Sequence, residues 1–213
     1  MVLLVLCSIV SLAVVLHRAA KLRRSKVMPP VIEAAIESLD PNGDGSDRLT
    51  RLVDGDPSAL GRIVHTCLRH LGWSKSENIE AVQTRARHEI VRLESGLVIL
   101  EIAVGIGPLL GLLGTVSGLV TVFGHLGTSS ANTDPRGVAA GIAEALNTTI
   151  VGLCIAIPSL IAHSHFSRKV ESMAAEMEAL AAELLAKCYP APREAREARE
   201  AGGAPAEAKE GGR

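Results

Sequence analysis

One acidic residue lies inside a long apolar stretch of this 213-residue chain, and its position suggests chemistry. Glu144 is the only charged side chain in the run 138–162, and Asn147, Thr148 and Thr149 follow it. An ionisable group inside a possible membrane span is expensive to insert and therefore indicates an ion or proton pathway. The alternative is a carboxylate that extends to the membrane surface, which lies only ~9 Å away along a helix. The deeper polar residues favour a site that faces protein or water.

Small residues repeat along two apolar stretches. In the run 97–123, four glycines recur at spacings of four, three and four, which aligns them on one helical face. They are Gly107, Gly111, Gly114 and Gly118, with Pro108 and Thr115 beside them. The run 138–162 carries a similar set on about one face, namely Gly141, Glu144, Thr148 and Gly152, with Pro158 following and Gly137 just before the run. Such faces let backbones approach closely, so they predict tight packing between helices. The same packing between copies of the chain could build the wall of an oligomer, with Thr115 beside it.

Three apolar runs must position these residues. They are 2–16, 97–123, whose single charge is Glu101, and 138–162. A content of 47% hydrophobic but 2% aromatic residues fits a chain whose apolar surface faces lipid, because soluble cores use more aromatic side chains. The net charge of −1 gives no sign of nucleic-acid binding. The first run is shorter than the ~20 residues that a span needs, so we expect an uncleaved anchor whose start is truncated.

Basic residues lie on one side of all three runs. Arg18, Lys21, Arg23, Arg24 and Lys26 follow the first run, Arg85, Arg87 and Arg92 precede the second, and Arg168 and Lys169 follow the third. The link between the second and third runs has only Arg136. Because basic loops stay in the cytoplasm, this pattern predicts that the N-terminus lies outside and the C-terminus in the cytoplasm. The family resemblance given below implies that the membrane is the bacterial inner membrane, so that the N-terminus is periplasmic.

The chain is therefore predicted to be an all-α membrane protein with three transmembrane helices, the second and third extended into the cytoplasm. The expected segments are a first span at 1–17, a cytoplasmic helical loop at 18–95, a second span at 96–124, a periplasmic loop at 125–137, a third span at 138–163, a cytoplasmic helix at 164–189 and a disordered tail at 190–213. Pro29 with Pro30, and Pro57 with Ser58, should open short helices in the loop. Because no Gly or Pro lies between Ser76 and Gly96, one helix is expected to run unbroken into the second span.

Two motifs give this chain a family resemblance. The stretch 107–118, Gly-Pro-Leu-Leu-Gly-Leu-Leu-Gly-Thr-Val-Ser-Gly, resembles the second-span motif of the MotA/TolQ/ExbB proton channel family, in particular ExbB and TolQ. The stretch 141–158 opens with Gly-Ile-Ala-Glu-Ala-Leu, includes Thr149, Gly152 and Pro158, and resembles the third-span motif. The two motifs occur in the family's order and spacing.

The resemblance implies a function and partners. It implies a homopentameric ring that surrounds the membrane helices of an ExbD/TolR-like partner. Each copy of that partner has one span, which carries an aspartate within the membrane. It implies that Glu144, Thr115 and Thr149 line the passage opposite that aspartate, whose protonation drives motion. A TonB/TolA-like protein would carry the work across the periplasm. The resemblance implies neither a cofactor nor an enzyme, and it leaves open import, envelope maintenance or a surface motor, and H⁺ or Na⁺.

Parts of the sequence also match other motifs. The segment 114–118 superficially resembles an intramembrane serine-protease motif, so a membrane hydrolase using Ser117 is one alternative and a purely structural scaffold is another. The Gly-to-Ser spacing is one residue too long for that motif, and no deep histidine is available to activate the serine.

The segment 40–45 matches the opening of a calcium loop, but Arg51 stands where a glutamate is required. His65, Cys67 and His70 fit an amphipathic helix, so no metal site is predicted, and the scattered cysteines indicate no disulfide framework.

Overall fold

The computed structural model describes residues 2–40, 45–128 and 135–190, and the described chain is helical without any β-strand. The elements are α1 (Val2–Lys21), α2 (Arg24–Val27), α3 (Pro30–Glu37), α4 (Ser46–Val53), α5 (Ala59–Arg69), α6 (Lys75–Glu94), α7 (Leu97–Thr128) and α8 (Pro135–Cys188). The predicted tail beyond residue 190 and most of the calcium-loop-like segment fall outside the described residues.

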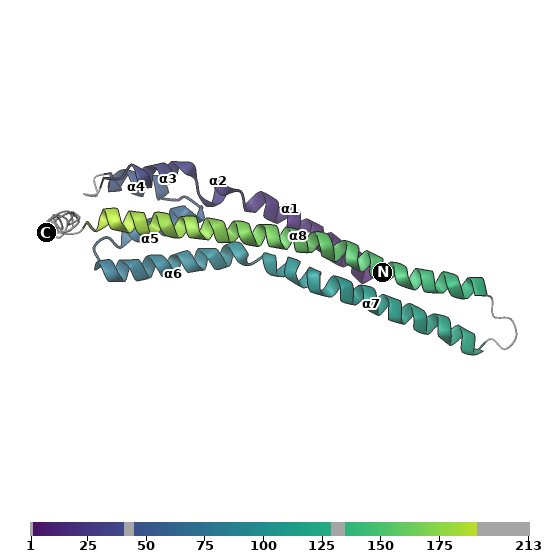
Figure 1. Ribbon diagram of the computed structural model, residues 1–213. Coiled ribbons are helices and arrows are strands. Elements are labelled where there is room, and N and C mark those ends of the chain that lie inside the picture. The colour runs from purple at the N-terminus through teal and green to yellow at the C-terminus, as the bar shows by residue number, and fades with distance from the viewer. Residues whose placement is uncertain (1, 41–44, 129–134, 191–213) are drawn as a thin grey trace, which may run out of the picture.

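Three helices, α1, α7 and α8, are long and apolar enough to cross a membrane. Helices α7 and α8 form an elongated hairpin, and α8 runs along almost the whole molecule (Figure 1). Both continue beyond the predicted spans, since α7 reaches Thr128 and α8 begins at Pro135 and ends at Cys188. The expected continuation of the third span into a long charged helix is therefore observed. The all-α prediction with three candidate spans is confirmed.

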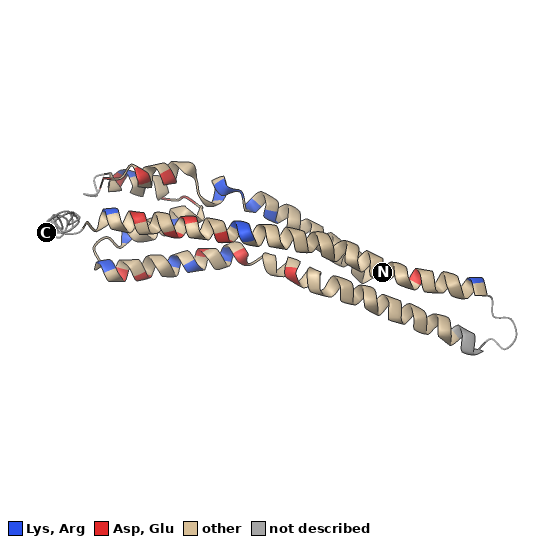
Figure 2. Cartoon of the chain, viewed as in Figure 1, with Lys and Arg blue, Asp and Glu red and all other residues tan. Residues whose placement is uncertain are grey.

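Charged side chains gather on the helices at one end of the molecule. Figure 2 shows acidic and basic residues concentrated on α2 to α6 and on the C-terminal half of α8, whereas the hairpin's other end carries few. Here α5, α6 and α3 pack on α8 around a core of apolar side chains. Fully or almost fully buried members include Ile36, Leu60, Ile63, Val170, Met177 and Leu184. We call this part of the molecule the charged bundle, comprising α2 to α6, residues 166–188 of α8 and Tyr189.

Local sequence signals start the helices of the charged bundle. Pro30 occupies the first position of α3, where its missing N–H has no helical partner to lose. The Ser58 hydroxyl accepts a hydrogen bond from the Gly61 amide at 2.9 Å and caps α5. Ser74 and Glu77 form a reciprocal capping box at the start of α6, and the hydrogen bonds from Ser74 lower the pKa of Glu77.

The prediction of one unbroken helix from Ser76 into the second span is wrong. Helix α6 ends at Glu94, and α7 begins at Leu97 after a turn at Ser95 and Gly96. The junction coincides with a tertiary contact that lies outside the segment: the Arg18 side chain from α1 fills the space beside Gly96 and donates a hydrogen bond to the Leu93 carbonyl oxygen at 3.0 Å. Periodicity within the α6–α7 segment contains no information about that contact.

Helix α1 packs on α7 and α8 and runs parallel to α8. The Ser11 and Ser159 hydroxyl oxygens are 2.5 Å apart, and further along the chain Arg24, at the start of α2, forms an ion pair with Glu176 of α8 at 2.8 Å. Counting back from Ser11 at 1.5 Å per residue, the start of α1 lies level with about residue 150 of α8. The part of the hairpin that contains Glu144 therefore extends beyond α1, as Figure 1 also shows.

Candidate functional site

The glycines of α7 and α8 meet each other inside the hairpin. A Cβ added to Gly111 would lie 2.9 Å from the Thr149 Cα, and one added to Gly152 would lie 2.6 Å from the Gly107 carbonyl oxygen. Distances this short leave no room for a side chain, so the two backbones touch at these positions.

Two further glycines of α7, and one of α8, continue the contact. A Cβ on Gly114 would lie 2.6 Å from the Thr148 hydroxyl oxygen, and one on Gly118 would lie 2.8 Å from the Ala145 Cβ. A Cβ on Gly141 would lie 2.5 Å from a methyl group of Val122. The glycine face of α7 therefore packs on α8 of the same chain.

Three threonines form a hydroxyl cluster between α7 and α8. The Thr115 and Thr149 hydroxyls are hydrogen-bonded to each other, and the Thr148 hydroxyl lies 3.5 Å from that of Thr115. Thr148 donates to the carbonyl oxygen of Ala145 at 2.7 Å or of Gly111 at 3.0 Å, and Thr115 can reach the same two acceptors. Each hydroxyl has one proton and several acceptors within reach, so the cluster can rearrange its hydrogen bonds without moving a helix.

Glu144 lies at the edge of this cluster and not within it. It precedes Thr148 by one helical turn, and the carbonyl of the next residue, Ala145, is an acceptor for the cluster. Its side chain is exposed on the single chain, and among the described residues no donor is bonded to its carboxylate. Asn147 is exposed as well. A carboxylate and a carboxamide are therefore presented outward by an otherwise apolar part of α8.

The two prolines lie inside their helices. Pro108 is part of α7 and Pro158 part of α8, and neither ends its helix. Because proline has no N–H, the carbonyls of Val104 and Cys154 lack their usual helical partner. Glu101, one turn from the start of α7, is exposed.

Sequence reasoning did not single out the serine contact between α1 and α8. Ser11 and Ser159 are both buried, and Ser159 also donates to the Ile155 carbonyl oxygen at 2.7 Å. The available signal was a serine within each apolar run, because a hydroxyl surrounded by lipid needs an internal partner.

No motif in the sequence singles out the ion cluster of the charged bundle. Glu89 is 1% exposed and forms ion pairs with Arg62 and, at 2.9 Å, with Arg85. Burial alone would raise the pKa of Glu89, but hydrogen bonding by Arg62 and the charges of Arg62, Arg85 and Arg92 outweigh it and lower the pKa. The cluster joins α5 to α6, which is a structural role.

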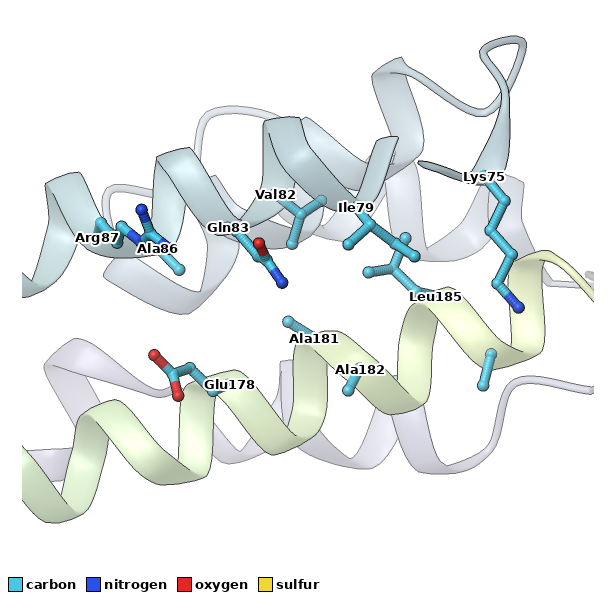
Figure 3. Close-up of a pocket in the computed structure, with 11 residues that line it drawn as sticks. Lys75, Ile79, Val82, Gln83, Ala86, Arg87, Glu178, Ala181, Ala182 and Leu185 are labelled. Atoms are coloured by element: carbon cyan, nitrogen blue, oxygen red, sulfur yellow. The ribbon is translucent and has the colours of Figure 1, made fainter. Parts of the chain in front are cut away.

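A groove on the charged bundle lies between α6 and α8. Its volume is about 450 Å³, and Ile79 from α6 and Leu185 from α8 point into it (Figure 3). Lys75, Arg87 and Glu178 are at its margins, and the remaining lining is mostly alanine and valine. This groove is remote in the fold from Glu144 and offers no arrangement suited to proton transfer.

The structure does not support Ser117 as a nucleophile. Ser117 is exposed on α7, and in the described part of the chain no histidine hydrogen-bonds to its hydroxyl. Without a neighbouring base, a serine hydroxyl is a weak nucleophile.

Known proteins are similar in sequence to the part of the chain that carries this site. The model of the MotA/TolQ/ExbB proton channel family matches residues 56–179, which include α7, most of α8, the threonine cluster and Glu144. An ExbB-like biopolymer transport protein of Synechocystis sp. is 32% identical over 66% of this chain and 54% of its own length. Biopolymer transport protein ExbB of Xanthomonas campestris pv. campestris is 35% identical over 52% of this chain and 44% of its own. The Tol-Pal system protein TolQ of Haemophilus influenzae is 30% identical over 61% of this chain and 51% of its own. The chain thus spans about half the length of these relatives.

Proposed function

Because the chain belongs to the MotA/TolQ/ExbB proton channel family, we propose that it is the ring-forming subunit of an inner-membrane motor driven by the proton motive force. Its family and its three apolar helices make it a multi-pass membrane protein. Members of this family are proton channels and not enzymes, so the hydrolase alternative is set aside.

The observation that carries the proposal is the position of Glu144 beside the threonine cluster. An ionised carboxylate on an apolar helix is stable only if it faces water, a polar passage or a partner's polar group. Glu144 is presented outward, and Thr148, one turn further along α8, belongs to the hydroxyl cluster with Thr115 and Thr149. This arrangement suits a second chain that carries a titratable group in the membrane.

The proposed partner is an ExbD/TolR-like protein with one span and a membrane aspartate. Protonation would remove the charge of that aspartate and so change its electrostatic interaction with Glu144 on the inner surface of the ring. A hydroxyl can donate to a carboxylate and accept from a carboxylic acid, so the threonines would serve both protonation states. Alternation between the two states would couple proton flow to relative motion of ring and partner.

The ring itself is proposed to be a pentamer. Large apolar side chains remain exposed on both hairpin helices, among them Leu109, Leu113, Val120, Leu146, Ile150 and Ile157. Such surfaces suit contact with lipid or with a neighbouring copy. In the proposed orientation the charged bundle lies in the cytoplasm, since the basic residues flank the spans on that side. A TonB/TolA-like protein would transmit the motion to the outer envelope.

The test is Glu144→Gln, with Glu101→Gln as the matched control on the exposed surface of α7. Each variant is purified with the partner, reconstituted into vesicles and measured for proton uptake, while cells that carry only the variant are assayed for energy-dependent output. We expect Glu144→Gln to assemble with the partner and lose proton uptake and output, because glutamine keeps the size but removes the charge. Glu101→Gln should behave like the wild type. Full output from Glu144→Gln would refute the coupling role, and failed co-purification would make Glu144 a structural contact.

A further inference from the structure

The junction between α6 and α7 has no sufficient local cause. Ser95 has helical backbone angles, φ −48° and ψ −29°, and its N–H still bonds to the Val91 carbonyl oxygen at 3.0 Å. No proline is present, and a single glycine weakens a helix by only about 1 kcal/mol. The segment could therefore continue as a helix, and something outside it must interrupt it.

A side chain from the first helix occupies the junction. Arg18 is only 6% exposed, and its Nη1 donates to the Leu93 carbonyl oxygen at 3.0 Å while its Nη2 lies 3.4 Å from the Ser95 hydroxyl. In an unbroken helix the Leu93 carbonyl would instead accept from the Leu97 amide. The guanidinium thus binds an acceptor that would otherwise join α6 to α7.

Gly96 makes room for this guanidinium. A Cβ at position 96 would lie 1.8 Å from the Arg18 Nη2 and 2.2 Å from its Cζ. Any other residue at 96 would therefore displace Arg18. The backbone of Gly96 does not need a positive φ, so the glycine is required for space alone.

The Arg18 charge is balanced by the helix end and not by a carboxylate. Among the described residues no acidic side chain forms an ion pair with Arg18, although Glu94 and Glu101 lie on either side of the α6–α7 junction in the sequence. The last carbonyls of α6 carry the negative end of the helix dipole, which attracts a cation. Arg18 is therefore bound where α6 ends.

We infer that Arg18 is a positioning residue: it keeps α6 and α7 separate and ties the first span to the point where the apolar hairpin meets the charged bundle. The effect of this joint on motor output rests on the proposed function. Removing the guanidinium frees the Leu93 carbonyl, and α6 and α7 then join into one helix, which changes the angle between the hairpin and the bundle.

The experiment is hydrogen–deuterium exchange of the full chain in detergent, followed by mass spectrometry of peptides that cover residues 95–100. In the wild type the first amides of α7 lack helical acceptors and should exchange fast. In Arg18→Met these amides gain acceptors, and their exchange should slow by about tenfold or more. Arg18→Lys, which can still donate to Leu93, should retain most of the fast exchange, and Lys21→Met is the exposed control on α1.

Gly96→Ala provides a second route to the same state. It should slow exchange in the wild type by displacing Arg18, whereas in the Arg18→Met background, where no guanidinium remains, it should add only the smaller effect of the higher helix propensity of alanine. Unchanged exchange in Arg18→Met, or two effects that simply multiply, would overturn the inference. Partner-dependent output is measured in parallel and should be lost in Arg18→Met but retained in Arg18→Lys. If Glu144→Gln kept full output, the proposed function would fail. The exchange data would still show whether Arg18 keeps α6 and α7 separate.

Discussion

Gly107 and Gly152 face each other across the hairpin so closely that a Cβ on Gly152 would lie 2.6 Å from the Gly107 carbonyl oxygen. This contact belongs to one chain, so the first consequence of the glycine face is a tight α7–α8 hairpin. A proposed oligomeric wall would be built from hairpins that are already closed.

Gly111→Leu should open the hairpin, because a side chain there would collide with the Thr149 backbone. Overpacking of this kind destabilises by about 1–3 kcal/mol or more. Thermal unfolding and oligomer size in detergent are the measurements, with Gly105→Leu as the control, since nothing lies within 4 Å of a Cβ at Gly105. Equal stability of the two variants would contradict the packing argument.

Thr115→Val should cost only about 1 kcal/mol of stability, the usual worth of one hydrogen bond, yet strongly reduce proton uptake with the partner. The hydroxyl is lost, while Thr148 and Thr149 remain. Thr115→Ser should keep uptake. Thr121→Val is the matched control on α7, since within the described residues the Thr121 hydroxyl bonds only to its own helix, at the Ser117 carbonyl oxygen. Normal uptake by Thr115→Val would remove the cluster from the proposed pathway.

Glu89→Gln should destabilise the charged bundle by about 1.5–3 kcal/mol at neutral pH, the range for hydrogen bonds to charged groups. The folded pKa of Glu89 is lowered, so its ionised form stabilises the fold. The stabilisation is complete above the ordinary value of 4.5 and is lost as the pH falls below it through the folded pKa.

Circular dichroism melts of wild type and Glu89→Gln, taken from neutral pH to below 4.5, check this prediction. The two melting temperatures should converge at the acidic end. Glu80→Gln is the control, because Glu80 is exposed on the same helix. A gap that widens on acidification would show that the sign is wrong.

Truncation after residue 190 should leave assembly and stability intact, whereas truncation after residue 186 should weaken both. The residues between these ends hold the charged bundle together. The Lys187 Nζ donates to the Ile36 and Glu37 carbonyl oxygens at 2.8 and 2.7 Å, and the Tyr189 hydroxyl accepts from the Asn78 side chain at 3.0 Å. Size-exclusion chromatography and melting of both truncated chains test this. Dissociation of the longer one would give residues 191–213 a role in assembly.

The sequence by itself determined the three apolar helices, the helix starts at Pro30 and Ser58, and the two motifs of the membrane family. These features are local: hydropathy, capping and spacing act within one turn or along one helix, so the chain order reveals them. Glu144 stood out for the same reason, as a charge within an apolar run.

Only the tertiary structure decided which surfaces meet. Periodicity aligned Gly107 and Gly111 on a face but did not identify α8 of the same chain as the surface against it. Cys67 and Cys188, far apart in sequence, lie together in the charged bundle, where a mutual hydrogen bond and burial raise the pKa of the Cys67 thiol. Arg18 binds the end of α6, a helix that begins more than fifty residues later in the chain. Such contacts depend on how whole helices pack, and a pattern within one helix does not encode the position of its neighbours.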